Sequence, residues 1–169
     1  MNYLKRSDSI KKKIRRLSWM FFDVDGILTD GSLYFSDKGE SIKRFNVLDG
    51  YGIKNLFNCG VDVGLISSRD HVATRIRAKE LGIETLMLKV VNKVEAFESW
   101  VVKNNIDPMQ CGHMGDDIPD LGLFSKVGFS ASVPNACDEI KFAADWISTK
   151  HGGNGAVREL CDLIVKTHE

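Results

Sequence analysis

The chain has 169 residues, of which 43% are hydrophobic and 27% charged, the size and composition of one soluble globular domain. These proportions exclude a disordered chain, a collagen and a coiled coil. The formal net charge is zero, but residues 1–19 carry seven basic residues against one acid, which leaves 16 basic and 22 acidic residues, a net charge of −6, in the remainder. A globule of that sign is a poor partner for nucleic acid. We expect a basic N-terminal helix or arm over residues 1–16 and a single domain over residues 17–169.

The expected location is the cytoplasm. No run of about 18 apolar residues is present, so no membrane span is predicted. The basic N-terminal stretch lacks the apolar segment of a signal peptide. Cysteines stand only at positions 59, 111, 137 and 161, too far apart for a C-x-x-C pair, which is typical of reduced thiols rather than of a disulfide framework or a zinc site.

Short apolar runs alternate along the chain with segments of helical period, the pattern of a parallel sheet with crossover helices. The predicted strands are residues 19–22, 61–66, 85–88, 110–114 and 127–130. The predicted helices are residues 50–59, 70–81, 91–104, 118–124 and 156–166. Between residues 31 and 45 the alternation breaks, and two short strands flanking a turn at Gly39 predict a β-hairpin. The sequence therefore predicts an α/β fold, a doubly wound (Rossmann-like), mostly parallel sheet with a projecting hairpin.

Polar residues follow four of the predicted strands, at the edge where open α/β sheets bind their ligands. In chain order they are Asp23 and Asp25, then Ser67, Ser68 and Arg69, then Lys93, and finally Asp116 and Asp117. Their convergence on one crevice is the strongest functional signal in the sequence.

The pair Asp23 and Asp25 stands two residues apart, so on extended chain both carboxylates point to the same side, and Gly26 permits a sharp turn just beyond. Two carboxylates so close together call for a cation or a shared proton. Because Asp116 adds a further oxygen ligand and no His or Cys lies beside these acids in the sequence, the pattern favours Mg²⁺ over zinc. Magnesium in turn suggests a phosphorylated substrate.

A phosphoryl-transfer mechanism fits these residues. Asp23 attacks the phosphorus and forms an aspartyl-phosphate, which water then hydrolyses. Asp25 protonates the leaving oxygen and later deprotonates the water. Ser67 donates a hydrogen bond to a phosphoryl oxygen, and Lys93 stabilises the charge on the transferring group.

Further polar residues have expected roles in binding, support or packing. Arg69 and Arg77 share a helix face and suit a substrate carboxylate, because the guanidinium fork binds carboxylates bidentately. Asp120 follows the acidic pair by one turn and either caps the helix or supports the site. His113 falls inside a predicted strand, where a core position is expected.

At these residues the sequence resembles the haloacid dehalogenase superfamily of phosphatases. The segment 23–31, Asp-Val-Asp-Gly-Ile-Leu-Thr-Asp-Gly, is similar to the first motif of that superfamily, and Ser67, Lys93 and the Gly-Asp-Asp of 115–117 are similar to the other three. The resemblance implies Asp23 as nucleophile, Asp25 as acid and base, and Mg²⁺ held by Asp23, the Asp25 backbone carbonyl and Asp116. It places Asp117 and Asp120 in supporting roles.

A narrower resemblance covers nearly the whole chain from about residue 17 and includes His-Gly-Gly-Asn-Gly-Ala-Val-Arg-Glu at 151–159. These pieces are similar to the cap-less family of phosphatases that act on 3-deoxy-D-manno-octulosonate 8-phosphate. The resemblance implies a domain without a cap, a small phosphorylated sugar acid as substrate, and a homotetramer whose hairpins and tails close neighbouring sites. It also implies a role in lipopolysaccharide precursor synthesis, with Gly26, Ser68, Arg69 and Arg77 on the substrate side. The sequence departs from that family at Ser68, which replaces glycine, and at Leu48, which replaces arginine.

Three alternatives stay open. A receiver domain uses similar residues, but its accepting Asp stands on a middle strand, and here the second-strand end offers serines. A non-catalytic oligomerisation or regulatory module would not need the full set of acids, Ser67 and Lys93. A phosphatase for a nine-carbon, sialic-acid-type sugar phosphate is the nearest enzyme, and Arg69 favours the eight-carbon substrate over it, because the nine-carbon relatives carry Glu at that place.

Overall fold

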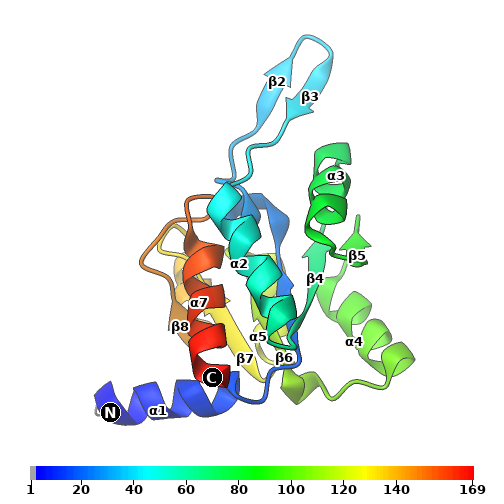
Figure 1. Cartoon of the computed structure of the whole chain (residues 1–169). Helices are drawn as coiled ribbons and strands as arrows, with labels where there is room; N and C mark the ends of the chain where they lie inside the picture. Colours follow the sequence, from blue (N-terminus) through cyan, green and yellow to red (C-terminus); the bar gives the residue numbers. More distant parts are fainter. Residues whose placement is uncertain (1–2) are drawn as a thin grey trace.

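The computed structural model describes residues 3–169 and the side chains of residues 8–39 and 42–169. Its centre is a six-stranded sheet in which every neighbouring pair of strands is parallel (Figure 1). From one edge to the other the order is β5 (Thr85–Leu88), β4 (Asp62–Ser67), β1 (Trp19–Phe22), β6 (Cys111–Met114), β7 (Phe129–Ser132) and β8 (Trp146–Ile147). The predicted doubly wound α/β fold is confirmed.

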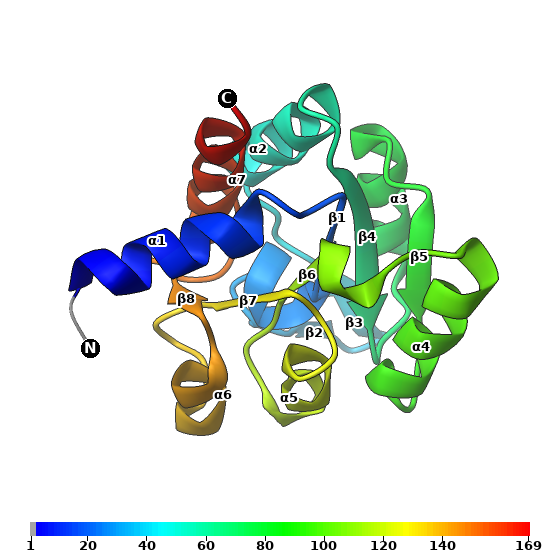
Figure 2. The ribbon, with the colours of Figure 1, turned by 90° about the horizontal axis from the view of Figure 1, so that it is seen from below.

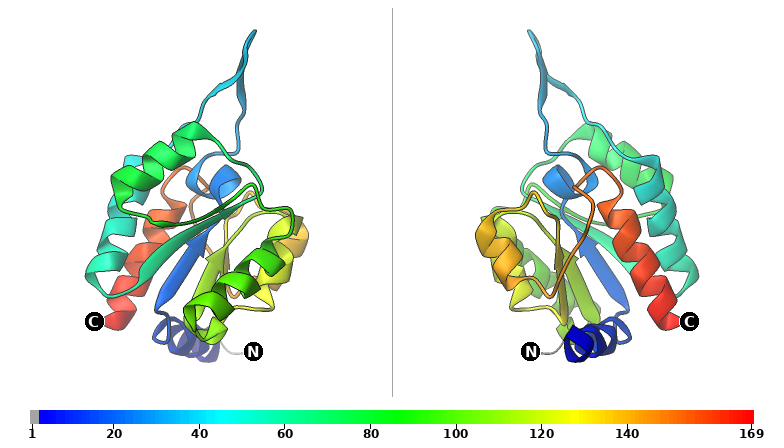
Figure 3. Two further views of the ribbon diagram at one scale, coloured as in Figure 1. Left: turned by 90° about the vertical axis from the view of Figure 1, so that its right-hand side faces the viewer. Right: turned by 90° about the vertical axis from the view of Figure 1, so that its left-hand side faces the viewer.

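Helices cover both faces of the sheet (Figure 3). One face carries α2 (Val47–Asn58), α3 (Val72–Leu81) and α7 (Ala156–His168). The other carries α4 (Lys93–Asn104), the short turn η2 (Pro108–Gln110), α5 (Ile118–Phe124) and α6 (Asp138–Ala143). The layers therefore bury the sheet on both sides, as parallel strands require.

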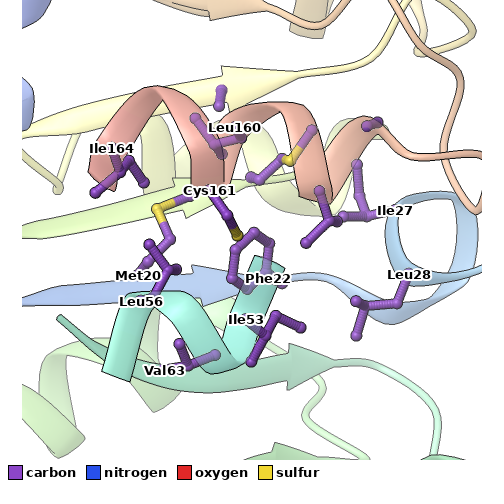
Figure 4. Packing of buried hydrophobic residues seen from close by; sticks show 14 of the residues in the cluster. Met20, Phe22, Ile27, Leu28, Ile53, Leu56, Val63, Leu160, Cys161 and Ile164 are labelled. Carbon is purple, nitrogen blue, oxygen red and sulfur yellow. The ribbon is translucent and has the colours of Figure 1, made fainter. Parts of the chain in front are cut away.

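The larger core lies between β1 and the pair α2 and α7. Figure 4 shows Ile53 and Leu56 of α2 facing Leu160 and Ile164 of α7 across Phe22. These five side chains are inaccessible to solvent, and burial of each contributes about 1.5–3 kcal/mol. On the other face Phe21 packs against Phe97 of α4 with the ring planes at 84°. The strand that carries the first acidic motif is thus clamped from both sides.

Among the α-helices and strands of the described residues, α6 and the edge strand β8 were not predicted from the sequence, and they follow one another between β7 and α7. Strand β8 has only two residues and α6 only six, too short for a periodic pattern to register. Helix α2 begins at Val47 rather than at residue 50, because the Asn46 side chain accepts a hydrogen bond from the Leu48 backbone N–H and caps it. Strand β7 lies two residues later than predicted.

Helix α1 (Tyr3–Ile14) lies at the end of the sheet where the strands begin, and its C-terminal residue Ile14 is buried in the larger core (Figure 2). Lys13 Nζ pairs with Asp145 Oδ1 at 2.6 Å. Residues 1 and 2 of the predicted basic arm lie outside the described residues, and the division of the chain at residue 16 stays a prediction.

The hairpin is formed by β2 (Tyr34–Ser36) and β3 (Gly39–Ile42), which pair antiparallel as a separate two-stranded sheet. Gly39 has a φ of +106°, as the turn needs. The hairpin stands away from the body at the end where the strands finish (Figure 1). Within residues 3–169 no cap domain covers this end.

No helix in the described part of the chain is long and apolar enough to cross a bilayer. The four cysteines are all free thiols. Burial raises the pKa of the Cys111 thiol to about 12 and raises that of Cys161 as well, so both are inert core residues.

Candidate active site

The polar residues predicted at the strand ends meet in one cavity of about 170 Å³. It opens beside β1 and β6, whose outer neighbours β4 and β7 lie on opposite sides, the position where the direction of winding changes and ligands bind in such sheets. The residues that line it are Asp23, Asp25, Ser67, Ser68, Arg69, Lys93, Asp116, Asp117, Pro119 and Asp120. A larger hollow of about 450 Å³, between the C-terminal ends of α2 and α7, contains none of the predicted site residues.

A chain of buried charged groups forms the floor of the cavity. Lys93 Nζ lies 3.0 Å from Asp23 Oδ1 and donates a hydrogen bond of 2.7 Å to Asp120 Oδ1. Asp120 Oδ1 also lies 2.7 Å from Nε2 of His113. Lys93 stands in the first turn of α4, and its placement beside Asp23 is fixed from the far side by Asp120.

Burial raises the pKa of Asp23 to about 7, and the neighbouring charge of Asp120 adds to the increase while Lys93 opposes it. The pKa of Asp116 is also raised to about 7, first by burial and then by Asp120. Two carboxyls that share one negatively charged neighbourhood therefore keep their protons to near neutral pH unless a cation enters.

The pKa values of Lys93 and Asp120 are shifted toward the charged forms of these two side chains. Burial alone would lower the pKa of Lys93, but the carboxylates of Asp23 and Asp120 outweigh it and the pKa is raised. Burial would raise the pKa of Asp120, yet its bond to His113 and the charge of Lys93 bring it below its ordinary value. Burial lowers the pKa of His113. Lys93 stays a cation and Asp120 an anion at neutral pH.

The first motif turns sharply after β1 because of Gly26. A helical turn, η1 (Val24–Leu28), is broken at Gly26, which has a φ of +90°. A side chain here would be strained, and its Cβ would collide with the Asp116 carboxylate. Thr29 Oγ1 accepts hydrogen bonds from the backbone N–H groups of Gly26 (3.3 Å) and Gly31 (3.2 Å) and closes the turn. Gly26 therefore brings the loops after β1 and β6 together.

Asp25 lines the same cavity as Asp23, and its Oδ1 accepts a short hydrogen bond from Lys43 Nζ. Lys43 is the residue directly after β3, and sequence analysis did not identify it. No sequence signal separates it from the other hairpin lysines and arginines, since only the return of the hairpin to the sheet brings it to Asp25. The Asp25 Oδ2 atom is buried and has no hydrogen-bond partner within the described part of the chain.

Of the predicted site residues that follow β4, some line the cavity and one does not. Ser67, Ser68 and Arg69 line the cavity, and Ser67 Oγ accepts a hydrogen bond of 3.2 Å from the Arg69 backbone N–H. Arg77 does not line it. Its guanidinium instead donates to the Asn46 backbone carbonyl at 3.1 Å and pairs with Glu80 at 2.8 Å. The structure thus keeps Arg69 at the cavity and ties Arg77 to the junction of α2 and α3.

Asp116 and Asp117 follow β6 and have separate surroundings. The Asp117 side chain accepts a hydrogen bond of 2.9 Å from the Ile118 backbone N–H and caps α5. Asp116 is held through its backbone carbonyl, which accepts a hydrogen bond of 3.0 Å from the Cys137 N–H. Its carboxylate is thereby left available at the cavity.

The carboxylates fit a hard divalent cation. Oxygen atoms of Asp23, Asp116 and Asp120 lie within 4.8 Å of one another, and this cluster contains no His or Cys ligand. Burial and then the charge of Asp120 raise the pKa of Asp23 and of Asp116, and a cation bound between these carboxylates would favour their ionised forms. An all-oxygen set suits Mg²⁺.

The glycine-rich segment at 151–155 packs on its own chain. The Gly153 N–H donates to the Ile27 carbonyl at 2.9 Å, and a Cβ on Gly152 would collide with the Gly26 carbonyl. Residues 152–153 thus support the first motif of the same chain. The expected reach of the tail into a neighbour's site stays a prediction.

A parallel sheet with acids at its switch point and a lysine paired to the first of them defines a class of hydrolase. The family model for haloacid dehalogenase-like hydrolases matches residues 70–160, and the chain belongs to that family.

The relatives give the particular activity within the family. The chain is 36% identical over 157 residues to the 3-deoxy-D-manno-octulosonate 8-phosphate phosphatase of Haemophilus influenzae, with 93% of this chain and 87% of that protein covered. The crystal structure of the Moraxella catarrhalis phosphatase of the same name, in complex with magnesium, phosphate and the sugar acid, is similar with a TM-score of 0.92 and 39% identity, covering 95% of this chain and 92% of that one. The structure of the cobalt-bound Haemophilus influenzae enzyme is similar with a TM-score of 0.88 and 36% identity, covering 92% of this chain and 91% of that one.

Proposed function

We propose that this chain is a magnesium-dependent phosphatase that hydrolyses 3-deoxy-D-manno-octulosonate 8-phosphate to the free sugar acid and phosphate, a step of lipopolysaccharide precursor synthesis. The observation that carries the proposal is the convergence of Asp23, Asp25, Ser67, Lys93 and Asp116 on one cavity. The activity of relatives that match more than nine tenths of the chain supports the substrate.

Asp23 is the nucleophile in this proposal. Lys93 lies 3.0 Å from it and holds a positive charge where the phosphoryl group is transferred. The ionised carboxylate attacks phosphorus and forms an aspartyl-phosphate, which water then hydrolyses. Asp25 gives a proton to the leaving sugar oxygen and later takes one from that water. Ser67 is placed to donate its hydroxyl to a phosphoryl oxygen.

Asp23, Asp116 and the backbone carbonyl of Asp25 hold the Mg²⁺. When bound, the ion neutralises the charge that the phosphoryl group and the clustered carboxylates bring together. Asp120 remains with Lys93 and His113 and acts by fixing the lysine.

Arg69 is the cation that we assign to the sugar-acid carboxylate, because it lines the cavity and Arg77 does not. Ser68 narrows the site at the place where the family has glycine. Arg69 also favours the eight-carbon substrate over a nine-carbon, sialic-acid-type phosphate. Leu48 lies exposed near the hairpin base, where the family has an arginine.

A homotetramer is the assembly that we propose. The hairpin exposes Leu33, Tyr34, Phe35 and Ile42 to solvent, more apolar surface than a two-stranded ribbon buries by itself. A neighbouring subunit with closed symmetry would cover this surface and restrict water at the cavity mouth. We place the enzyme in the cytoplasm, since four free cysteines suit a reducing compartment.

The test is a phosphate-release screen with Mg²⁺ over phosphorylated sugars and sugar acids. We expect the eight-carbon sugar-acid phosphate to give the highest kcat/KM and the nine-carbon compound to follow it. Highest kcat/KM for a neutral sugar phosphate would contradict the assignment of Arg69, and absence of any Mg²⁺-dependent release would contradict the enzyme class and favour a non-catalytic module.

A further inference from the structure

Lys43 is a buried cation at the root of the hairpin. Its side chain is 2% exposed, and its Nζ donates a hydrogen bond to Oδ1 of Asp25. The residue directly follows β3, on the segment that leads from the hairpin back to the body of the molecule. A lysine is rarely buried unless it is paired, so the contact with Asp25 is built into the fold rather than incidental.

The pairing affects which oxygen of Asp25 carries a proton. An ammonium group has three donors and no acceptor, so the oxygen that it bonds must act as an acceptor. Oδ1 is therefore held as an acceptor. A carboxyl oxygen that carries a proton is the weaker acceptor, so the contact with Lys43 favours Oδ2 as the position of a proton on Asp25. In agreement, Oδ2 is the Asp25 atom that is buried without a hydrogen-bond partner among the described residues.

We infer that Lys43 is a positioning residue that directs the transferable proton of Asp25 to Oδ2. The inference rests on the proposed function, in which Asp25 is the acid and base. In the first half-reaction the sugar O–P bond breaks, Asp23 forms the new bond to phosphorus, and the proton on Oδ2 moves to the sugar oxygen. In the second half-reaction water forms a bond to phosphorus, the Asp23–phosphorus bond breaks, and the water proton returns to Oδ2.

Arg44 provides the matched comparison. It follows Lys43 directly but points to a different acid, with Nη1 3.1 Å from Asp30 Oδ2 and Nη2 donating to Asn154 Oδ1 at 3.1 Å. Its side chain is 49% exposed, and it does not contact Asp25 in the described structure. Removing either cation loosens the hairpin root, but only the removal of Lys43 takes the hydrogen-bond donor away from the Asp25 carboxyl.

The experiment compares the two variants on esters with different leaving groups in the full-length protein with Mg²⁺. An alkyl ester such as the sugar-acid phosphate needs a proton on its leaving oxygen, whereas p-nitrophenolate leaves without one. Release of the alcohol or phenol is measured in the first turnover, so that the later hydrolysis step does not mask the difference. General acid catalysis contributes about 10²–10⁴-fold, and we expect Lys43→Met to lose roughly tenfold or more on the alkyl ester with less than about threefold on p-nitrophenyl phosphate.

Arg44→Met should change both substrates by the same factor. Lys43→Arg, which keeps a charged donor, should restore most of the rate on the alkyl ester. Should Lys43→Met fail to fold, Lys43→Gln retains a donor of similar length, and it should show the same selective loss, smaller in size.

Equal losses of Lys43→Met, or of Lys43→Gln in its place, on the two esters would overturn the inference, because that pattern belongs to a structural or binding role. Asp25→Asn separates this failure from a failure of the proposed function. If Asp25→Asn loses the alkyl ester selectively and the Lys43 variant does not, only the assignment of Lys43 is wrong. If Asp25→Asn is also insensitive to the leaving group, the proposed acid and the inference fail together.

Discussion

Asp120 shows how a residue that touches no reacting atom can determine the charge of those that do. One of its oxygens accepts hydrogen bonds from both Lys93 and His113, and this double contact brings its pKa below the ordinary value despite burial. Burial raises the pKa of Asp23 and of Asp116, and the charge of Asp120 raises both further. Together with Asp23, Asp120 also raises the pKa of Lys93. Asp23, the proposed nucleophile, is consequently held beside the Lys93 cation in a cluster where carboxylates outnumber lysines.

Asp23→Asn is expected to abolish turnover, because the amide is nearly isosteric but cannot attack phosphorus at neutral pH. The thermal midpoint should not fall, since the substitution removes a buried carboxylate that costs stability when ionised. Phosphate release and a thermal melt at pH 8 check the two expectations. Retention of more than about a hundredth of the wild-type rate would be too much for loss of a nucleophile.

Gly26→Ala should separate the two loops that Gly26 joins. The new Cβ meets the Asp116 carboxylate and sits on backbone with a φ of +90°, so we expect kcat to fall about a hundredfold, as displacements near 1 Å commonly cause. Gly82→Ala is the control, because Gly82 has a φ of +80° with open space around it. Stabilisation by Mg²⁺ in a thermal melt should be lost in Gly26→Ala and kept in Gly82→Ala. Equal loss in both would assign the effect to backbone strain alone.

At the scale of elements, the hairpin combines two functions that the body of the sheet cannot supply. Its root delivers Lys43 to Asp25 and Arg44 to Asp30, while its strands expose Phe35 (67%) and Ile42 (60%). An isolated two-stranded ribbon is marginally stable in water. The ion pairs at the root and a partner that covers the exposed strands are the two sources of support that such an element needs.

The double variant Phe35→Ser, Ile42→Ser is expected to dissociate the assembly. Burial of each apolar side chain contributes about 1.5–3 kcal/mol, so the loss at every contact is at least about 3 kcal/mol. Sedimentation should show a smaller species and a phosphate-release assay a lower rate. Val102→Ser on α4 is the control, since Val102 is 81% exposed on the other side of the molecule. An unchanged mass and rate in the double variant would mean that the exposed hairpin strands have no partner.

At the scale of the whole molecule, the sheet gathers more acid than its own cations neutralise. The winding changes direction beside β1 and β6, and this brings Asp23, Asp116 and Asp120 within 4.8 Å. With the pKa of Asp23 and Asp116 raised from 3.8 to about 7, the folded protein without metal binds more protons than the unfolded chain between these pH values. The contribution of the two groups to the free energy of unfolding is therefore fully present below pH 3.8 and lost as the pH rises to about 7.

Mg²⁺ should reverse that trend, because it binds the ionised carboxylates and competes with their protons. We expect the rise in thermal midpoint on adding Mg²⁺, relative to chelator, to be small at pH 5.5 and large at pH 8. The measurement is a thermal melt with and without metal across this range, and Asp116→Asn should flatten the dependence. An equal rise at both pH values would place the metal away from these two acids.

The assembly prediction concerns the mass in solution. The purified protein should sediment as a species of four times 18.9 kDa, since a cap-less domain leaves its cavity open unless neighbours cover it. Activity should fall on dilution to the concentration at which the species dissociates. A fully active monomer at sub-micromolar concentration would contradict the tetramer.

The sequence by itself predicted five of the six strands of the sheet, most of the helices and most of the residues that line the cavity. Apolar strands such as Trp19–Phe22 are local patterns, and in a parallel sheet every residue just past a strand is carried to the same edge, so Asp23, Ser67, Lys93 and Asp116 could be placed together without coordinates. The family motifs are likewise short segments that can be recognised from the sequence alone.

Only the tertiary structure decided which of the remaining charges belong to the site. The helical spacing in the sequence predicts the same role for Arg69 and Arg77. In the structure Arg69 lines the cavity, whereas Arg77 donates a hydrogen bond to the Asn46 carbonyl. Lys43 pairs with Asp25 because the hairpin returns beside the first motif, and His113 bonds Asp120 because β6 and α5 meet there. The physical reason is that these contacts join segments whose approach is set by loop geometry and packing, neither of which leaves a periodic trace in the sequence.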